Sequence, residues 1–287
     1  MFKLERSAPW IFVLIWSSGF VVAKYAFANS DVLFFLSVRL LIAAGILALI
    51  TVALGQSLYL PRRDLFSSLA IGISLHAIYL GGVWEAIAEG SPAGIASVIT
   101  SLQPVFVSVI AVQFLGEKLS KFAVLGLILG FGGVLLVLEP SFSRAGEMNA
   151  LALTLLILAL AGSTAATLAQ KKIGHSISLL SGTTYQFLIA GVFLGAISLI
   201  SGRNRLEWNL QSTLAMTWAV VVTSLIAILL LLWMLKKGSA ARVSSLLYLV
   251  PPMTALQAFL LFGEKLNPQA IIGIAMTALG VALVQKL

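Results

Sequence analysis

Residues 116–119 read Gly-Glu-Lys-Leu, and the same four residues return at 263–266, which is 147 positions later. The register holds on both sides of this turn without a gap. Identities at the same spacing are Ser97 with Ser244, Leu102 with Leu249, Pro104 with Pro251, Ala111 with Ala258, Gly126 with Gly273, Gly133 with Gly280, Val134 with Val281, Leu136 with Leu283, and Lys24 with Lys171. Chance similarity between apolar segments does not reproduce an identical polar turn in one register, so the chain contains an internal repeat.

Composition places the chain in a bilayer. Apolar and aromatic residues make up 60% of its 287 residues, charged residues make up 10%, and the mean hydropathy is +1.07. A soluble domain of this length needs far more surface charge, whereas a surface that faces lipid needs none. The net charge of +8 comes from 18 Lys and Arg residues scattered between apolar runs, as in the loops of membrane proteins, and it does not indicate nucleic-acid binding.

Ten apolar segments are long enough to cross hydrocarbon about 30 Å thick, which takes roughly 20 residues. We predict an all-α membrane protein with ten transmembrane helices, at 8–27, 32–54, 65–88, 92–115, 122–138, 150–169, 178–200, 211–234, 241–262 and 270–286. The first segment has features of a signal peptide. We assign it as a helix because Lys24 interrupts the end of the run and because the repeat requires it.

The distribution of Lys and Arg predicts the orientation. With ten helices both termini share a side, and twelve basic residues fall there: Lys3, Arg6, Arg62, Arg63, Lys118, Lys121, Lys171, Lys172, Lys236, Lys237, Arg242 and Lys286. Five fall on the other side: Lys24, Arg144, Arg203, Arg205 and Lys265. Because positive loops stay in the cytoplasm, we expect a multi-pass protein of the cell inner membrane with both termini cytoplasmic.

Each repeat unit holds five helices, and an odd number inverts the second copy in the membrane. We therefore expect two inverted five-helix repeats, at 8–138 and 150–286. Two halves related in this way can rock about a shared site at the midplane and open it to either face, which is alternating access.

The repeat also resembles a known family. The residues that carry the resemblance are Trp16-Ser17-Ser18-Gly19-Phe20, Lys24, Arg39, the stretch 91–119 and the stretch 251–266. They are similar to the EamA-type pattern of the drug/metabolite transporter superfamily, over nearly the whole chain. The resemblance implies ten helices, a central cavity lined mainly by helices 1, 3, 4, 6, 8 and 9, and export of amino acids or related metabolites.

Polar residues stack on one face of two expected helices. Helix 4 carries Ser97, Ser101, Pro104 and Ser108 at helical spacing, and helix 9 carries Ser244, Tyr248, Pro251 and Ala255. Pro104 and the pair Pro251-Pro252 donate no backbone hydrogen bond, so nearby carbonyls lose their partners. This face is either a substrate surface with a hinge at these prolines or a contact between helices that pack through small residues.

Ionisable residues inside the membrane are costly and mark candidate functional sites. His76 lies near the middle of helix 3, with Tyr79 three residues on and Thr223 as its repeat mate. Glu85 is nine residues from His76, on the opposite side of the helix, so we do not expect the two in one cavity. Glu85 is expected to form a structural ion pair with Arg39 or Lys24; a coupling carboxylate is the alternative.

The expected cavity is amphipathic and mostly neutral. Its candidate residues are Trp16, His76, Tyr79, Ser97, Thr100, Ser101, Ser163, Thr223 and Tyr248. Because the helix centres supply no Lys or Arg, we expect a small zwitterion or a similar amphipathic metabolite rather than a strongly anionic substrate.

Competing functions leave weaker traces. The sequence has no zinc-protease motif, nucleophile elbow or phosphate loop, so an intramembrane enzyme is disfavoured. With no cysteine and two histidines, we expect no metal site and no cofactor. A translocase of lipids or lipid-linked head groups stays open as an alternative. The expected partners are a small-molecule substrate and the lipid bilayer, with no nucleic acid.

Overall fold

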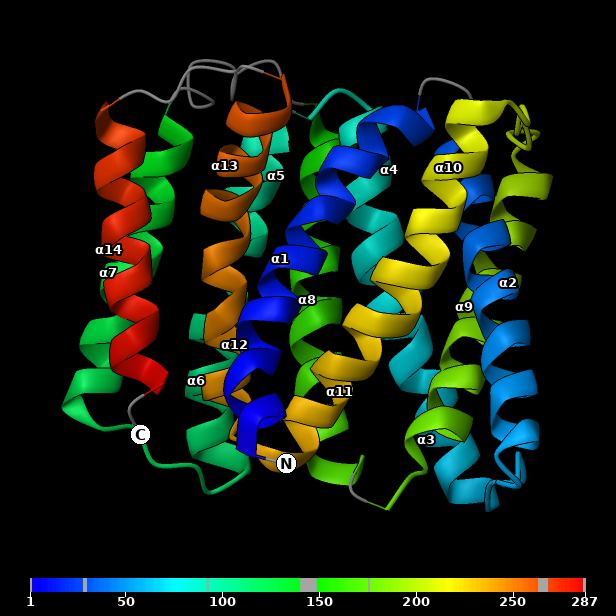
Figure 1. Ribbon diagram of the computed structural model, residues 1–287, viewed down its shortest axis with the longest axis horizontal. Coiled ribbons are helices and arrows are strands. Elements are labelled where there is room, and N and C mark those ends of the chain that lie inside the picture. Colours follow the sequence, from blue (N-terminus) through cyan, green and yellow to red (C-terminus); the bar gives the residue numbers. More distant parts are fainter. Residues whose placement is uncertain are drawn as a thin grey trace.

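The computed structural model describes residues 2–27, 30–91, 93–139, 149–174, 176–262 and 268–285, and these residues are almost entirely helical. The elements are α1 (Phe2–Phe27), α2 (Val32–Ala53), α3 (Arg62–Gly72), η1 (Ile73–Gly81), α4 (Gly82–Ala88), α5 (Ala93–Thr100), α6 (Gln103–Phe114), α7 (Lys121–Leu138), α8 (Ala150–Ile173), α9 (Leu179–Ile200), α10 (Leu210–Trp218), η3 (Ala219–Ala227), α11 (Ile228–Lys237), α12 (Ala240–Ser245), η4 (Leu246–Leu249), α13 (Val250–Phe262) and α14 (Pro268–Gln285). They form one bundle in which α1 begins and α14 ends at the same end (Figure 1).

Within the described residues, eight helical stretches are long and apolar enough to cross a membrane. They are Val32–Ala53, Arg62–Ala88, Ile95–Phe114, Lys121–Leu138, Ala150–Ile173, Leu179–Ile200, Leu210–Lys237 and Pro268–Gln285. The prediction of an all-α membrane protein is thus confirmed. The other two expected spans fall on α1 and on the run from α12 to α13, which cross the height of the bundle beside the others (Figure 1). The count of ten stays a prediction.

Polar caps fix where several helices begin at the bundle ends. Ser120 accepts a hydrogen bond from the backbone N–H of Ala123 at the start of α7, and Asn149 does the same for Ala152 at the start of α8. Glu117, from the first Gly-Glu-Lys-Leu turn, accepts from the backbone N–H of Ala240 at 2.6 Å and so caps α12. The first Gly-Glu-Lys-Leu turn thus supplies a capping charge to another helix, and the second copy, 263–266, lies outside the described residues.

The last helices of the two halves, α7 and α14, meet through glycines. A Cβ on Gly126 would lie 2.5 Å from the carbonyl oxygen of Gly280, and one on Gly133 would lie 2.6 Å from that of Gly273. In the 147-residue register Gly126 corresponds to Gly273, and Gly133 corresponds to Gly280. The contacts are crosswise, because Gly126 meets Gly280 and Gly133 meets Gly273. Such reciprocal contacts are what a twofold axis between antiparallel helices produces, and small residues let the backbones approach closely.

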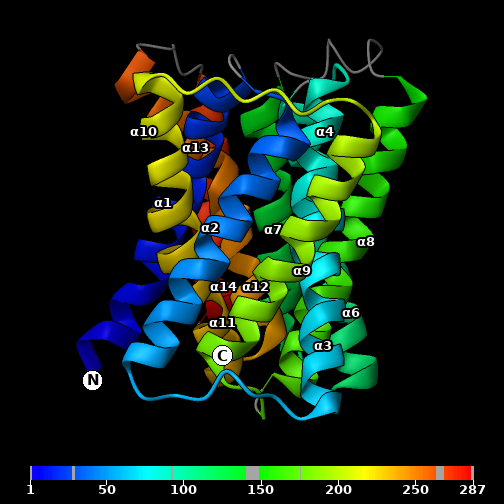
Figure 2. The same cartoon turned by 90° about the vertical axis from the view of Figure 1, so that its right-hand side faces the viewer.

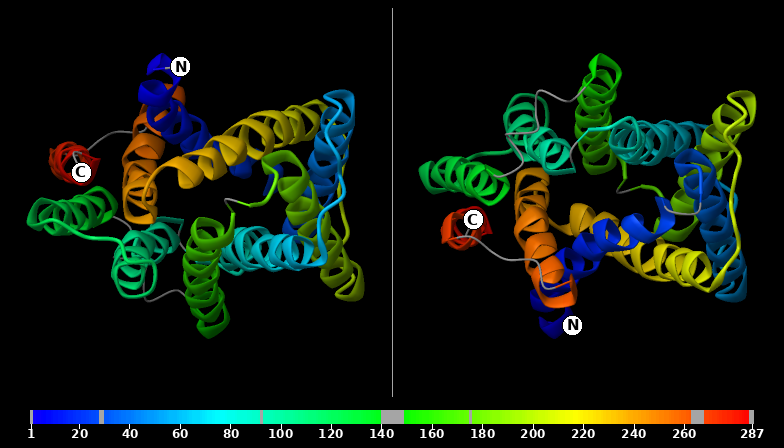
Figure 3. Two further views of the ribbon diagram at one scale, coloured as in Figure 1. Left: turned by 90° about the horizontal axis from the view of Figure 1, so that it is seen from below. Right: turned by 90° about the horizontal axis from the view of Figure 1, so that it is seen from above.

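Two helix pairs, α7 with α14 and α2 with α9, flank the rest of the bundle. Viewed along the helices, α7 and α14 lie at one end of the molecule and α2 with α9 at the other (Figure 3). Ser37 of α2 donates a hydrogen bond to the carbonyl of Gly191 in α9 at 2.8 Å. The segment that joins α9 to α10 crosses the bundle at the end opposite the termini (Figure 2). The remaining helices lie between these two pairs (Figure 3).

Both halves also depart from α-helical geometry at matching places. The third membrane segment of each half contains a π-helix, η1 in the first and η3 in the second. The expected helices 4 and 9 are interrupted near Ser101 and at the 3₁₀ turn η4, respectively. Pro104 and the pair Pro251-Pro252 therefore sit in the first turns of α6 and α13, where a missing N–H costs no intrahelical bond. Their role as hinges stays a prediction.

Candidate substrate cavity

A central cavity lies between the two halves of the chain. The first half lines it with Trp16 of α1, Arg39 of α2, His76 and Tyr79 of η1, and Trp84 of α4. The second half contributes Phe187 of α9 with Thr223 and Ser224 of η3. Both π-helices therefore face this cavity, in keeping with the frequent use of π-helical turns at functional sites. Trp16, His76, Tyr79 and Thr223 were candidates from sequence.

Arg39 is the charged residue of this cavity, and it is only 6% exposed. Its Nε donates a hydrogen bond to Ser224 Oγ and its Nη2 donates to Thr223 Oγ1, each at 2.8 Å. The guanidinium also lies 5.9 Å from the ring centre of Trp84. The expectation of a cavity without Lys or Arg is therefore wrong. A run of apolar residues around Arg39 did not reveal that its long side chain extends to η3.

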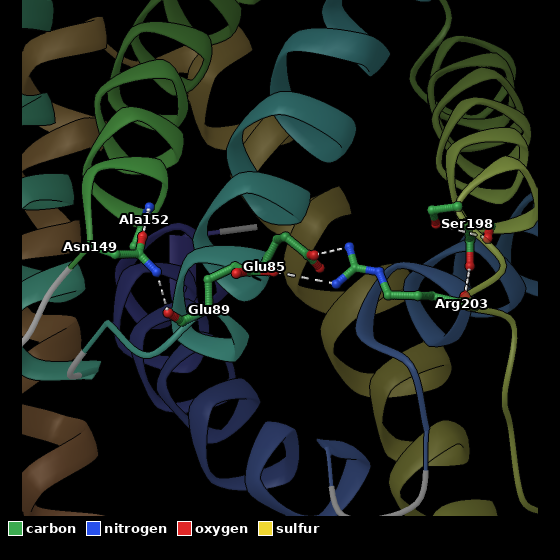
Figure 4. A network of polar contacts seen from close by, with 7 residues as sticks. Glu85, Glu89, Asn149, Ala152, Ser198 and Arg203 are labelled. Atoms are coloured by element: carbon green, nitrogen blue, oxygen red, sulfur yellow. Dashed lines mark hydrogen bonds and ion pairs between the residues drawn. The ribbon is translucent and has the colours of Figure 1, made fainter.

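The ion pair expected between Glu85 and Arg39 does not form; Glu85 pairs with Arg203 instead. Arg203 lies beyond α9, and its Nη1 also approaches Glu89 at 3.4 Å. Figure 4 shows both glutamates of the α4 end pointing toward this arginine, with Asn149 on the other side of Glu89. Glu85 and Arg203 line a separate hollow with Asp31, so Glu85 and His76 line different cavities, as expected. The side chain of Lys24 lies outside the described part of the chain.

His76 packs against an aromatic ring, and its Nε2 forms no hydrogen bond to a described residue. Its ring meets Phe187 edge to face, with the ring centres 4.8 Å apart. Its Nε2 is buried and has no hydrogen-bond partner among the described residues. A buried polar atom without a partner is costly, so an unmet ring nitrogen beside a cavity indicates a position where a ligand or water completes the bond.

A second, more polar cavity adjoins the first and shares Trp16 and Tyr79 with it. It lies at the interruptions of the two broken helices, and its other lining residues include Ser97, Thr100, Ser101, Gln103, Pro251 and Thr254. The hydroxyl of Thr100 donates to the carbonyl of Ala96 at 2.9 Å. Gln103 and Thr254 were missed from sequence. Gln103 was detectable as an uncharged polar residue inside an apolar span.

A third, smaller cavity continues from the same two aromatic residues toward α8. Ser163 lines it together with Gln103 and Thr167. Gln103 Nε2 donates to Thr167 Oγ1 at 2.9 Å and approaches the carbonyl of Ser163 at 3.3 Å. This bridge links the start of α6 to α8 across the two halves of the chain. The candidate Ser163 thus lies beside the cavity system.

Tyr248 lies elsewhere. It belongs to the 3₁₀ turn η4, is fully buried and is not among the residues that line these three cavities. Its ring packs on α7, where a Cβ added to Gly130 would lie 2.6 Å from Tyr248 Cδ2. Leu247 takes the cavity position instead. Helical spacing placed Tyr248 on the cavity face, but a 3₁₀ turn rotates about 120° per residue rather than about 100° and shifts the face.

A bundle of apolar helices with an amphipathic cavity between its two halves is typical of a membrane transporter. The EamA-like transporter family matches residues 10–139 and 150–285, and the chain belongs to this family. The chain is 28% identical over 95% of its length to uncharacterized transporter YvbV of Bacillus subtilis, covering 88% of that protein. It is 27% identical over 94% of its length to uncharacterized inner membrane transporter YedA of Escherichia coli, covering 87% of that protein. A solved crystal structure with 15% identity overlays on 97% of this chain and 96% of its own, with a TM-score of 0.82, which shows the fold.

Proposed function

We propose that this transporter exports amino acids or similar small amphipathic metabolites across the cell inner membrane by alternating access. The observation that carries the proposal is the position of the cavities, which are lined by both repeats, while polar contacts join the two halves at both ends of the bundle. In alternating access, a substrate site lies between two halves, and contacts between the halves close the site at one end of the bundle or at the other.

At the end opposite the termini, the second half is fastened to the first by the segment after α9. Arg203 pairs with Glu85 and Glu89, and the backbone N–H of Arg205 donates to Asp31 Oδ2 at 2.7 Å. The backbone N–H of Asp31 donates to the carbonyl of Arg205 at 2.8 Å. Opening the cavity to this side requires these contacts to separate.

At the end that holds the termini, different contacts join the halves. Glu117 of the first half caps α12 of the second, and Ser181 of α9 donates to the carbonyl of Ser57 at 2.8 Å. The contacts at one end can break while those at the other persist, because no side chain is shared between them. Pro104 and the pair Pro251-Pro252 mark the places where α6 and α13 would pivot.

We further propose that both termini are cytoplasmic, on the basis of the excess of basic residues on their side. Lys118 is then cytoplasmic and Lys265 external. The chain has no native cysteine, so a single cysteine at position 118 is the only thiol. We expect no labelling of that cysteine by an impermeant thiol reagent on whole cells. Labelling from outside would reverse the orientation.

Transport is tested in proteoliposomes that contain the purified chain. The panel consists of radiolabelled amino acids, nucleosides and sugars, each measured with and without a pH gradient, against protein-free liposomes. We expect uptake above the protein-free level for amino acids or related amphipathic metabolites only. Uptake restricted to sugars or nucleosides, or uptake of none of the panel, would contradict the proposal.

A further inference from the structure

Arg39 is a buried cation whose visible partners carry no charge. Three ion pairs join the described side chains, and none of them involves Arg39. Its two hydrogen-bond acceptors are hydroxyls, and Thr223 holds its own orientation by donating to the carbonyl of Ala219 at 2.8 Å. Hydroxyl groups orient a guanidinium but do not neutralise it. A buried charge without an opposite charge is strongly unfavourable.

The bonds that hold Arg39 occupy one edge of its guanidinium. Nε and Nη2 point to Ser224 and Thr223, respectively. Nη1 makes no hydrogen bond to a described residue, and it is not fully buried. It can therefore be reached from the cavity. The edge formed by Nη1 and the second N–H of Nη2 presents two parallel donors, and that pair matches the two oxygens of a carboxylate.

The surroundings set the sign and the number of charges that this edge can accept. No Asp or Glu is among the described residues that line the central cavity, and Glu85, the only acidic residue within the ten expected spans, is paired with Arg203. One guanidinium balances one negative charge. A phosphate dianion would leave a charge unbalanced, and an ammonium group would find no carboxylate.

We propose that the central cavity binds the carboxylate of a monoanionic amphipathic substrate on the Nη1–Nη2 edge of Arg39. The proposal rests on the proposed transport function and names its substrate class. His76 lines the same cavity, and its buried Nε2 has no hydrogen-bond partner among the described residues, so a small rotation of the ring would offer it to the substrate. Trp16, Tyr79 and Trp84 face the same cavity and suit an apolar or aromatic body. A zwitterion is accepted less well, because its ammonium finds no carboxylate among the described residues that line the cavity.

Four probes with one phenyl body and different charges test this proposal. They are 3-phenylpropanoate, phenylalanine, phenylalaninamide and 3-phenylpropanamide, titrated by calorimetry into the full chain in lipid nanodiscs. We expect the propanoate to bind at least about tenfold more tightly than the neutral propanamide, because hydrogen bonds to charged groups are the strong ones. Phenylalanine is expected to lie between them, and the cationic amide to bind most weakly. Equal affinity for the propanoate and the propanamide, or binding of neither, would overturn the proposal.

Variants of Arg39 show whether this side chain causes the preference. Arg39→Gln should abolish the difference between propanoate and propanamide, whereas Arg39→Lys should keep part of it. Arg63→Gln is the control, because Arg63 is exposed in the first turn of α3. Amino-acid transport by proteoliposomes that persists undiminished in Arg39→Gln would overturn this inference and leave the proposed function standing. Failure of the wild-type chain to transport any of the panel would instead overturn the function.

Discussion

Two arginines of this protein lie in contrasting surroundings. Arg203, at the rim of the bundle, is about half exposed and pairs with Glu85 and Glu89. Arg39, inside the bundle, is almost fully buried and bonds only to the hydroxyls of Thr223 and Ser224. Arg203 is partly solvated and needs an ion pair least, yet it has two acidic partners. Arg39 is buried and needs an ion pair most, yet it has no acidic partner among the described residues. We therefore interpret Arg203 as a structural contact between the two halves, and Arg39 as part of the proposed binding site.

The largest effect is expected when Arg39 is given the kind of partner that Arg203 has. In Ser224→Asp, a carboxylate replaces the hydroxyl that accepts from Nε. This tethered carboxylate should compete with the substrate at an effective concentration in the millimolar range and reduce transport by at least about tenfold. Uptake into proteoliposomes measures the loss. Ser224→Asn is the matched neutral control, and equal uptake by the two variants would contradict a carboxylate site at Arg39.

A medium effect, on stability rather than on substrate affinity, is expected when the rim pair is broken. Arg203→Gln leaves the carboxylate of Glu85, whose side chain is 10% exposed, without its partner. The expected loss is about 1–3 kcal/mol of unfolding free energy. Thermal unfolding in detergent monitors it, and the double variant Glu85→Gln/Arg203→Gln should recover most of the loss. Transport by Arg203→Gln at the wild-type substrate affinity is expected, since Arg203 does not line the central cavity.

The smallest effects separate a residue inside the cavity from one outside it. His76→Phe keeps a ring against Phe187 but removes Nε2, so transport should fall several-fold without loss of fold. Tyr248→Phe removes a buried hydroxyl that has no hydrogen-bond partner among the described residues, which should leave transport unchanged and stability equal or higher. Initial uptake rates at matched expression distinguish the two. A larger transport defect in Tyr248→Phe would place the site on the other face of η4.

Much of the fold follows from the sequence because its determinants are local or repetitive. Apolar run lengths located the eight spans, and the 147-residue register paired Gly126 with Gly273 and Gly133 with Gly280. The register could not show that Gly126 meets Gly280 and Gly133 meets Gly273, so that each glycine contacts the repeat mate of the other. It is the fold that brings the two copies together along α7 and α14.

The candidate site was less accessible from sequence, because its polar partners come from distant segments and from non-α turns. Arg203 follows Glu85 by 118 positions, and the reach of a long arginine side chain has no periodic signature. Tyr248 was misplaced because uniform helical spacing does not anticipate the turn η4. By contrast, Ser97, Ser101 and Thr223 line cavities as expected, since isolated polar residues in apolar spans turn away from lipid.

The glycine contact between α7 and α14 also bears on how the protein is made. Helices enter the membrane in the order of synthesis, so α7 is in place long before its partner, which is the last helix of the described chain. Until α14 arrives, Gly126 and Gly133 of α7 lack the helix that they contact in the folded protein. A protein truncated before Pro268 would lack α14 and leave the glycine face of α7 without its partner. We expect quality-control proteases to degrade this truncated protein, although most of its membrane spans are intact.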